Sequence, residues 1–322
     1  MPRRNGGVVL RFARCYGASF VRSPKGVTMN PIRDQHIPGV LRLHAPVEPA
    51  VPLVFDSPHS GTDYPADFGA MAPVAELRAA EDTFDDDLYG AAPGLGAPLL
   101  CALFPRLYID PNRAETDMDP AEIEGAWDGP PLSPGAKSRL GQGVVWTRRP
   151  PGLPVYDGKL PAAALRARIE GYHRPYHRAL ARVLDATAAR FGGYYHVNCH
   201  SMPSLASNMS AEPPGTKRPD IVLGTLDGLT AGPELVDAVR AHLSGRGLDV
   251  RVNEWFKGLH IIRAAGDPAR GRHSLQIEVN RRLYMDEERI GKGPGYATIR
   301  SVFTDLIENL RRFAAARPPG PK

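Results

Sequence analysis

Short apolar segments alternate with longer amphipathic segments from residue 51 to residue 316, and this alternation restricts the fold more than any other feature. Strands are expected at residues 51–56, 99–103, 107–109, 194–198, 221–226, 248–253, 259–263 and 274–280. Helices are expected at residues 74–92, 161–191, 232–245 and 295–316. Strands that alternate with helices favour a mostly parallel sheet that is covered on both faces. With no internal repeat and no clear linker, the pattern predicts a single α/β domain.

Three further features of the chain lead to structural expectations. Residues 114–160 are rich in glycine, proline and charge, and they are expected to form a long excursion with little regular structure, a kind of loop that often carries function. Pro175 should kink the helix at 161–191. The proline-rich end at residues 317–322 should be frayed.

The formal net charge of +5 comes from the N-terminal tail. Residues 1–33 hold seven basic residues and no acidic one, so the remainder has 33 basic residues against 35 acidic ones. A nearly neutral body without a nucleic-acid motif argues against a nucleic-acid partner. No apolar run approaches the length of about 18 residues that a membrane span needs, so no membrane partner is expected either.

The tail itself, taken as residues 1–36, has three interpretations. It resembles an organellar transit peptide because its residues 1–33 are rich in arginine and lack acids, and it has no secretory apolar core. It could also be an over-extended reading frame that truly starts at Met29, which is the interpretation we favour. The catalytic domain is expected to cover residues 37–316. Three sparse cysteines suit a reducing compartment, so a cytoplasmic location is expected.

Two histidines, His59 and His200, stand at the ends of strand-like runs that lie nearly a whole domain apart in sequence. In an α/β sheet, ligands bind beyond the carboxyl ends of the strands. A catalytic zinc takes three protein ligands and keeps one open position. The two imidazoles therefore indicate a metal site at the rim of the sheet, and with it an enzyme.

A carboxylate should complete this metal site, and the segment after residue 80 offers several. Asp82 is the preferred ligand, and Asp86, four residues later on the same predicted helix face, could orient an imidazole. Asp63 is a fallback ligand, and Asp86 is a further alternative. Taken alone, this acidic cluster could also be a solvated helix face.

Glu278 is the best candidate for a general base. It interrupts an otherwise apolar, β-rich run at residues 275–279, and a buried carboxylate needs either a partner or a function. The structural alternative is a salt bridge to Arg281 or Arg282, and the sequence favours neither interpretation.

Arg106, Asn112 and Arg113 form a further group at residues 106–113. An arginine fork suits carboxylates, and an arginine near a metal could stabilise an oxyanion. Asp110 could instead pair with Arg113 to fix the loop, a contact that would not exclude substrate binding.

Other histidines and a cysteine are assigned structural roles. His173 and His177 have metal-like spacing but lack the acid of a His-Glu-x-x-His motif, so packing against the wall of the active site is expected. His196 should be a core residue or lie behind a ligand. Cys199 is expected to be a small buried residue rather than a nucleophile.

Together these pieces resemble the N-formylglutamate amidohydrolase family from about residue 51 to about residue 312. The resemblance rests on motifs at residues 57–61 (SPHSG), 82–89 (DxxxDxLY), 108–113 (YIDPNR), 174–177 (RPYH), 199–202 (CHSM), 220–228 (DxxLGTxDG), 256–258 (FKG) and 275–285 (LQIEVNRxLYM).

The resemblance implies a fold similar to that of the zinc carboxypeptidases and aspartoacylases. It implies that His59, Asp82 and His200 hold one zinc ion per chain, that Glu278 moves protons, and that Arg106 and Arg113 flank the substrate beside Asn112. The implied substrate is a small anionic N-acyl amino acid, N-formyl-L-glutamate, whose hydrolysis belongs to histidine degradation. Lys257 or Arg281 would join Arg113 in holding its carboxylates.

This sequence departs from the pattern of the family and of its peptidase-like relatives at three places. Thr62 stands where those relatives place an acid three residues after the first histidine, so the second ligand must come from elsewhere. Asn198 replaces an aspartate two residues before the second histidine, so a negatively charged group behind His200 is less to be expected. Leu259 replaces the second of two glycines in a loop expected to shape the substrate pocket.

Two other functions remain open at this point. The chain could be an amidase for another N-acyl amino acid or a small peptide, which rates on a panel of N-formyl and N-acetyl amino acids would reveal. It could also be a non-catalytic binding protein that keeps the fold, in which case it would lack about one zinc per chain. The sequence does not indicate an oligomeric state.

Overall fold

An eight-stranded sheet runs through the part of the chain that the structure describes, residues 32–320 of a computed structural model. Its strands lie in the order β1 (Gln35–Ile37), β2 (Leu41–His44), β4 (Leu99–Ala102), β3 (Leu53–Ser57), β9 (Tyr194–Met202), β12 (Arg272–Asn280), β10 (Ile221–Gly224) and β11 (Val250–Val252). The four central strands β4, β3, β9 and β12 run parallel, while β2 and β10 pair with them antiparallel. The predicted α/β class with a mixed, mostly parallel sheet is therefore confirmed.

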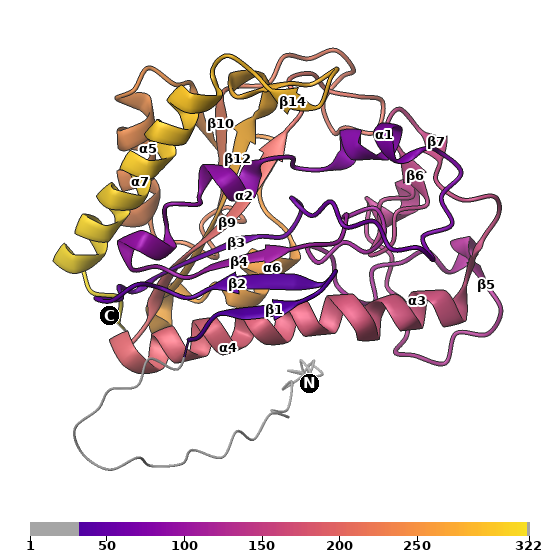
Figure 1. Cartoon of the computed structure of the whole chain (residues 1–322), viewed down its shortest axis with the longest axis horizontal. Coiled ribbons are helices and arrows are strands. Elements are labelled where there is room, and N and C mark those ends of the chain that lie inside the picture. The colour runs from indigo at the N-terminus through magenta and orange to yellow at the C-terminus, as the bar shows by residue number, and fades with distance from the viewer. Residues whose placement is uncertain (1–31, 321–322) are drawn as a thin grey trace, which may run out of the picture. The chain divides into compact units, whose positions relative to one another are not determined.

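Helices cover both faces of this sheet (Figure 1). Side chains alternate along β3, so Leu53 and Phe55 enter one apolar core while Val54 enters the other. The first core packs against α2 (Asp85–Leu88), α5 (Pro233–Ser244) and α7 (Tyr296–Ala316). The second packs against α3 (Ala162–Arg168), α4 (Arg174–Phe191) and α6 (His260–Ala265). None of the helices within residues 32–320 is long and apolar enough to cross a membrane.

The helix predicted at 161–191 is divided by a π-helical turn at Ile169–His173, just before Pro175. Proline has no N–H to donate to the carbonyl of residue 171, and the wider turn accommodates this loss. Figure 1 shows α3 and α4 following one another along one side of the sheet.

The excursion between β4 and α3 has little regular structure, as predicted. It holds only the short elements η3 (Pro120–Glu122), β5 (Ile123–Glu124), η4 (Ser138–Leu140), β6 (Arg148–Arg149), β7 (Leu153–Pro154) and β8 (Leu160–Pro161). Near the C-terminal end lie η6 (Pro268–Arg270), η7 (Arg281–Leu283), β13 (Met285–Asp286) and β14 (Gly291–Lys292).

The prediction of one helix at residues 74–92 was wrong. The segment divides into α1 (Val74–Leu77), η1 (Arg78–Ala80) and α2, and η2 (Pro93–Leu95) follows it. A break at residues 81–84 separates η1 from α2, and Phe84 there has a left-handed backbone with φ of 65°. A continuous helix would hold five acids within seven residues, whereas the break lets Asp82 and Asp85 enter separate buried environments. Asp82 and Asp86 therefore do not share a helix face.

Two predicted strands are not strands. Residues 107 and 108 belong to a turn at residues 106–108, and residues 260–263 begin α6. The β-branched pair Ile261 and Ile262 favoured a strand by propensity. The first turn of α6 is instead stabilised by a distant contact, because the Ile261 N–H donates to Asn112 Oδ1 over 3.0 Å.

The predicted boundaries also change at both ends. β1 begins at Gln35, so the tail boundary at residue 36 was slightly late, and the interpretations of residues 1–31 lie outside the described residues. At the other end, Pro319 is buried beside Gly193, and Arg317 O accepts a hydrogen bond from Tyr195 Oη. Pro319 is thus packed, whereas the side chains of Arg317 and Pro318 are exposed, and the expected fraying of residues 317–322 stays a prediction.

Candidate metal centre

His59 and His200 meet because they are carried by adjacent parallel strands. His59 lies two residues beyond the end of β3, whereas His200 lies inside β9, two residues before its end. β3 and β9 pair directly, so the two ring centroids are only 4.6 Å apart. Both side chains are buried. The predicted meeting of the two imidazoles at this rim of the sheet is confirmed.

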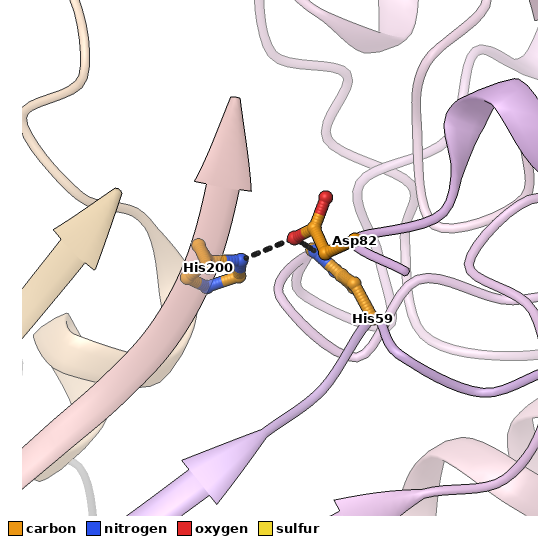
Figure 2. Close-up of side chains that lie close together, drawn as sticks. All are labelled: His59, Asp82 and His200. Carbon is orange, nitrogen blue, oxygen red and sulfur yellow. Dashed lines mark hydrogen bonds and ion pairs between the residues drawn. The ribbon is translucent and has the colours of Figure 1, made fainter. Parts of the chain in front are cut away.

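Asp82 joins the two histidines from the break between η1 and α2 (Figure 2). Its Oδ2 lies 3.3 Å from His59 Nδ1 and 3.1 Å from His200 Nδ1. The Asp82 N–H donates to His59 O over 3.0 Å, which fixes the backbone beside the first histidine. One ligand atom from each of the three residues lies within 4.8 Å of the others. Neither Asp63 nor Asp86 belongs to this group in the described chain.

The outer nitrogen of each imidazole has a separate partner. His59 Nε2 lies 2.7 Å from Asp110 Oδ1, and His200 Nε2 lies 2.8 Å from Asn198 Oδ1. The prediction that Asp86 orients an imidazole was wrong, because Asp86 lies beyond the helix break and Asp110 has this position. Asn198 Nδ2 in turn donates to Asp56 over 2.8 Å, so a buried charge stands behind the neutral amide.

These contacts test whether the site fits a metal. A carboxylate and an amide oxygen can only accept, so both Nε2 atoms carry the proton and both Nδ1 atoms present a lone pair. Asn112 Nδ2, a donor, also lies 3.1 Å from His200 Nε2, so for His200 this assignment follows the shorter contact. Two lone pairs then face a carboxylate oxygen, an arrangement that a cation between them would stabilise. Two histidines and one aspartate form a donor set that zinc accepts.

The other oxygen of Asp82 is held by arginine. Arg281 Nη2 donates to Asp82 Oδ1 over 2.9 Å, and Arg106 Nη1 lies 3.6 Å from the same oxygen. Burial acts to raise the pKa of Asp82, but its pKa lies well below the usual value, and the charge of Arg106 is one cause. Arg281 also donates to Ala79 O and Ser201 Oγ, so most of its guanidinium is engaged in holding the site together.

Glu278 lies on β12 directly opposite His200 on β9. Its carboxylate is buried and accepts one hydrogen bond, from Gln276 Nε2 over 2.9 Å. Neither suggested ion pair forms, because Arg281 binds Asp82 and Arg282 binds Asp220. Burial raises the pKa of Glu278, although His200 and Arg106 oppose the shift. A buried carboxyl group that has no ion pair within residues 32–320, beside a cluster that could hold a metal, is suited to carrying protons.

Arg106 and Arg113 flank Asp110 on the excursion. Arg106 Nη2 donates to Asp110 Oδ2 over 3.1 Å, and its guanidinium lies 4.8 Å from the centre of the Trp146 ring. Arg113 donates to Gln142 O and Asn112 O, both over 3.1 Å. Its predicted pairing with Asp110 is a marginal contact at 4.0 Å, because Asp110 mainly binds His59 and Arg106.

The remaining histidines and Cys199 have the predicted structural roles. His173 and His177 contact the carbonyl oxygens of Arg113 and Pro111, each over 2.8 Å, and so support the segment that carries Asn112. His196 is buried against Asp56. Burial raises the pKa of the Cys199 thiol well above its usual value, which disfavours a nucleophilic thiolate.

A cavity of about 470 Å³ opens beside the cluster, and His59, His200 and Glu278 line it. Its basic side chains are Arg106, Arg113, Lys137, Arg218, Lys257 and Arg281. Lys257, predicted to bind substrate, is half-exposed and lies 3.0 Å from Asp227. Sequence reasoning missed Lys137 and Arg218, because both come from long irregular loops whose course no periodic pattern reveals.

Comparisons with known proteins agree with this geometry. A sequence model of the family described as N-formylglutamate amidohydrolase matches residues 51–285. An N-formylglutamate deformylase from Pseudomonas putida is 31% identical over 242 residues, which cover 74% of this chain and 83% of that protein. One from Pseudomonas aeruginosa is 30% identical over 274 residues, with 83% and 95% covered.

A solved structure shows the same relationship. The crystal structure of an N-formylglutamate amidohydrolase from Ralstonia eutropha JMP134 is 44% identical, with a TM-score of 0.83, over 86% of this chain and 99% of that one. The chain therefore belongs to the N-formylglutamate amidohydrolase family.

Proposed function

We propose that this protein is a zinc-dependent amidohydrolase that cleaves N-formyl-L-glutamate into formate and L-glutamate. The single observation that carries the proposal is the convergence of His59, Asp82 and His200 opposite Glu278, which has no ion pair within residues 32–320, in a cavity lined with basic side chains. The names of the relatives supply the substrate. A cytoplasmic location and a place in histidine degradation stay predictions.

The histidine and aspartate residues would hold the metal, and Asp110 and Asn198 would fix the two rings through their outer nitrogens. A bound zinc ion would polarise the substrate carbonyl and make water a better nucleophile. Other divalent ions accept the same donors, so metal analysis has to establish which one is bound.

Glu278 would carry the proton that hydrolysis moves. Its carboxylate would take a proton from the attacking water, and a C–O bond would form at the formyl carbon. The same carboxyl would then return the proton to the amide nitrogen as the C–N bond breaks. The raised pKa of Glu278 suits this exchange, because it brings the group closer to neutral pH.

Arg106 would stabilise the negative charge that develops on the formyl oxygen, because its guanidinium lies beside Asp82. Its stacking on Trp146 and its bond to Asp110 keep it in one orientation. Asn112 and Arg113 would bind the amino-acid part of the substrate, with Arg113 receiving a carboxylate. Arg281 would contribute by holding Asp82.

The test is release of formate from N-formyl-L-glutamate by the purified, zinc-loaded chain, with bound metal measured in parallel. Turnover that requires about one metal ion per chain would support the proposal. A metal-free protein with no turnover of any N-acyl amino acid would overturn it and favour a binding protein.

A second candidate is hydrolysis of an N-acyl amino acid larger than N-formylglutamate. Leu205, Trp255 and Leu259 line the same cavity and are exposed, although the proposed substrate has no large apolar group. A panel of N-formyl and N-acetyl amino acids would show whether such substrates have the higher kcat/KM.

A further inference from the structure

Six lysine and arginine side chains line the cavity, and four of them are already neutralised by acids. Arg218 pairs with Glu212 over 2.5 Å and Lys257 with Asp227 over 3.0 Å. Arg281 pairs with Asp82 over 2.9 Å and Arg106 with Asp110 over 3.1 Å. These four basic groups are therefore less available than an unpaired cation to bind a carboxylate of the substrate.

Lys137 is one of the two basic groups that remain. Its Nζ donates to Met209 O over 2.8 Å, and no carboxylate in residues 32–320 lies within ion-pair distance of it. An ammonium group has three N–H donors, so two of them are available. Burial and the nearby charge of Arg113 lower the pKa of Lys137, as expected for a partly buried cation that lacks an anion.

Arg113 is the second. Its Nε and Nη1 are used by the carbonyls of Gln142 and Asn112, while its Nη2 makes no hydrogen bond within the described chain. Its contact with Asp110 is 4.0 Å long, and that carboxylate already binds His59 and Arg106 at shorter distances.

Gln142 connects these two basic groups. The Gln142 N–H donates to Lys137 O over 2.9 Å, across the turn that contains η4, and Gln142 O accepts from Arg113 Nε. The turn therefore links the backbone of Lys137 to the guanidinium of Arg113, and the hydrogen bond to Met209 O holds the Lys137 side chain. Within residues 32–320, Lys137 has no ion pair and Arg113 has only the marginal one with Asp110, so the two cations favour a bound anion in the cavity.

We propose that Lys137 and Arg113 form a two-point site for a dicarboxylate substrate. Arg113 binds the carboxylate next to the scissile amide, and Lys137 binds the carboxylate of the side chain. The order follows from the chain, since Arg113 is adjacent to Asn112, whose amide contacts His200. The proposal rests on the proposed function, and it makes Lys137 the residue that distinguishes glutamate from uncharged side chains.

The experiment compares N-formyl-L-glutamate with N-formyl-L-glutamine, which differ only in the charge of the side-chain end. In Lys137→Met, the KM for N-formylglutamate should rise about 10- to 100-fold, because a charge-assisted hydrogen bond is lost. The KM for N-formylglutamine should hardly change, and kcat should stay close to that of the wild type for both. The preference for glutamate over glutamine should therefore collapse.

Two further variants separate charge from structure. Lys137→Gln keeps a donor for Met209 O but has no charge, so it should lose the same preference while thermal unfolding stays unchanged. Lys217→Met makes the same chemical change at an exposed lysine that does not line the cavity, and it should behave like the wild type.

Calorimetry measures the same selectivity as a difference in binding affinity. Both N-formyl compounds are titrated into zinc-loaded Glu278→Gln, with and without the additional change Lys137→Met. Equal losses for both compounds, or no loss for either, would overturn the role of Lys137. Absence of N-formylglutamate turnover by the wild type would instead overturn the proposed function, and the calorimetric selectivity would still decide the role of Lys137.

Discussion

His59, His200 and Glu278 come from three neighbouring strands of the sheet, whereas Arg106, Asp110, Arg113 and Lys137 come from the irregular excursion between β4 and α3. We call these the strand half and the excursion half of the site. Backbone pairing fixes the strand half, since Glu278 stands in register with His200. Side-chain hydrogen bonds and ion pairs hold the excursion half.

The difference separates two tasks. Reactive groups benefit from rigid elements that hold them in one geometry. Groups that determine substrate selectivity can lie on loops, where sequence changes leave the sheet intact. The strand half should therefore control turnover and metal, and the excursion half should control KM and selectivity, with Asp110 as the residue that connects them.

The largest effect is expected from removing a ligand in the strand half. His200→Ala should lower bound zinc well below one equivalent and reduce formate release to background, because two ligands hold zinc poorly. Metal analysis and formate release measure both losses. Cys199→Ser, a neighbouring change in the same strand, should keep metal and turnover. A fully active His200→Ala would remove His200 from the metal site.

Glu278→Gln should keep its zinc and lower kcat by about 10²- to 10⁴-fold, the usual contribution of general acid–base catalysis. The amide has nearly the same shape but cannot exchange the proton. Steady-state rates with parallel metal analysis provide the measurement. Equal loss of metal and turnover would show that Glu278 supports the cluster instead of carrying protons.

Asp110→Asn tests whether the excursion half supports the strand half. Loss of the charged acceptor behind His59 should weaken zinc binding by about 10- to 100-fold. Competition with a zinc chelator measures this affinity. Asp86→Asn is the matched control, because Asp86 makes no contact with either imidazole in the described chain, and its affinity should equal that of the wild type. The reverse result would restore the interpretation from sequence.

The smallest effect is a shift in pH dependence. Glu278 must be ionised to accept a proton, and burial raises its pKa, so kcat/KM should fall as pH drops through a value above the ordinary 4.5. The pH profile of kcat/KM, with bound zinc checked at each pH, measures this limb. An acid limb at or below 4.5 would contradict the raised pKa.

Sequence reasoning performed best where one strand carries one chemical group. His59, His200 and Glu278 stand at or near the ends of apolar runs, and the parallel arrangement of those runs follows from their alternation with helices. Asp82 could be selected as well, because it matches a family motif. The surroundings of Asp82 could not be predicted, because the expected helix at 74–92 placed Asp86 beside it, whereas the backbone breaks between the two residues.

The excursion half was less accessible to sequence reasoning. Arg106, Asn112 and Arg113 stand in one motif, but Lys137 lies 24 positions after Arg113 in an irregular segment. Its importance comes from its lack of an ion pair within residues 32–320, which depends on how the loops fold over the cavity. The same holds for Arg281, whose guanidinium is directed to Asp82 by tertiary packing.

The sequence by itself determined the α/β class, the two histidines that meet across β3 and β9, and the buried glutamate opposite them. These follow from local periodicity and from the short list of side chains that bind metal. Only the tertiary structure decided that Asp110 supports His59 and that Arg281 holds Asp82. It also decided that, within residues 32–320, Lys137 has no ion pair and Arg113 has only a marginal one. Those outcomes depend on which charges come within a few ångströms of one another, and the spacing of residues along the chain does not specify such distances.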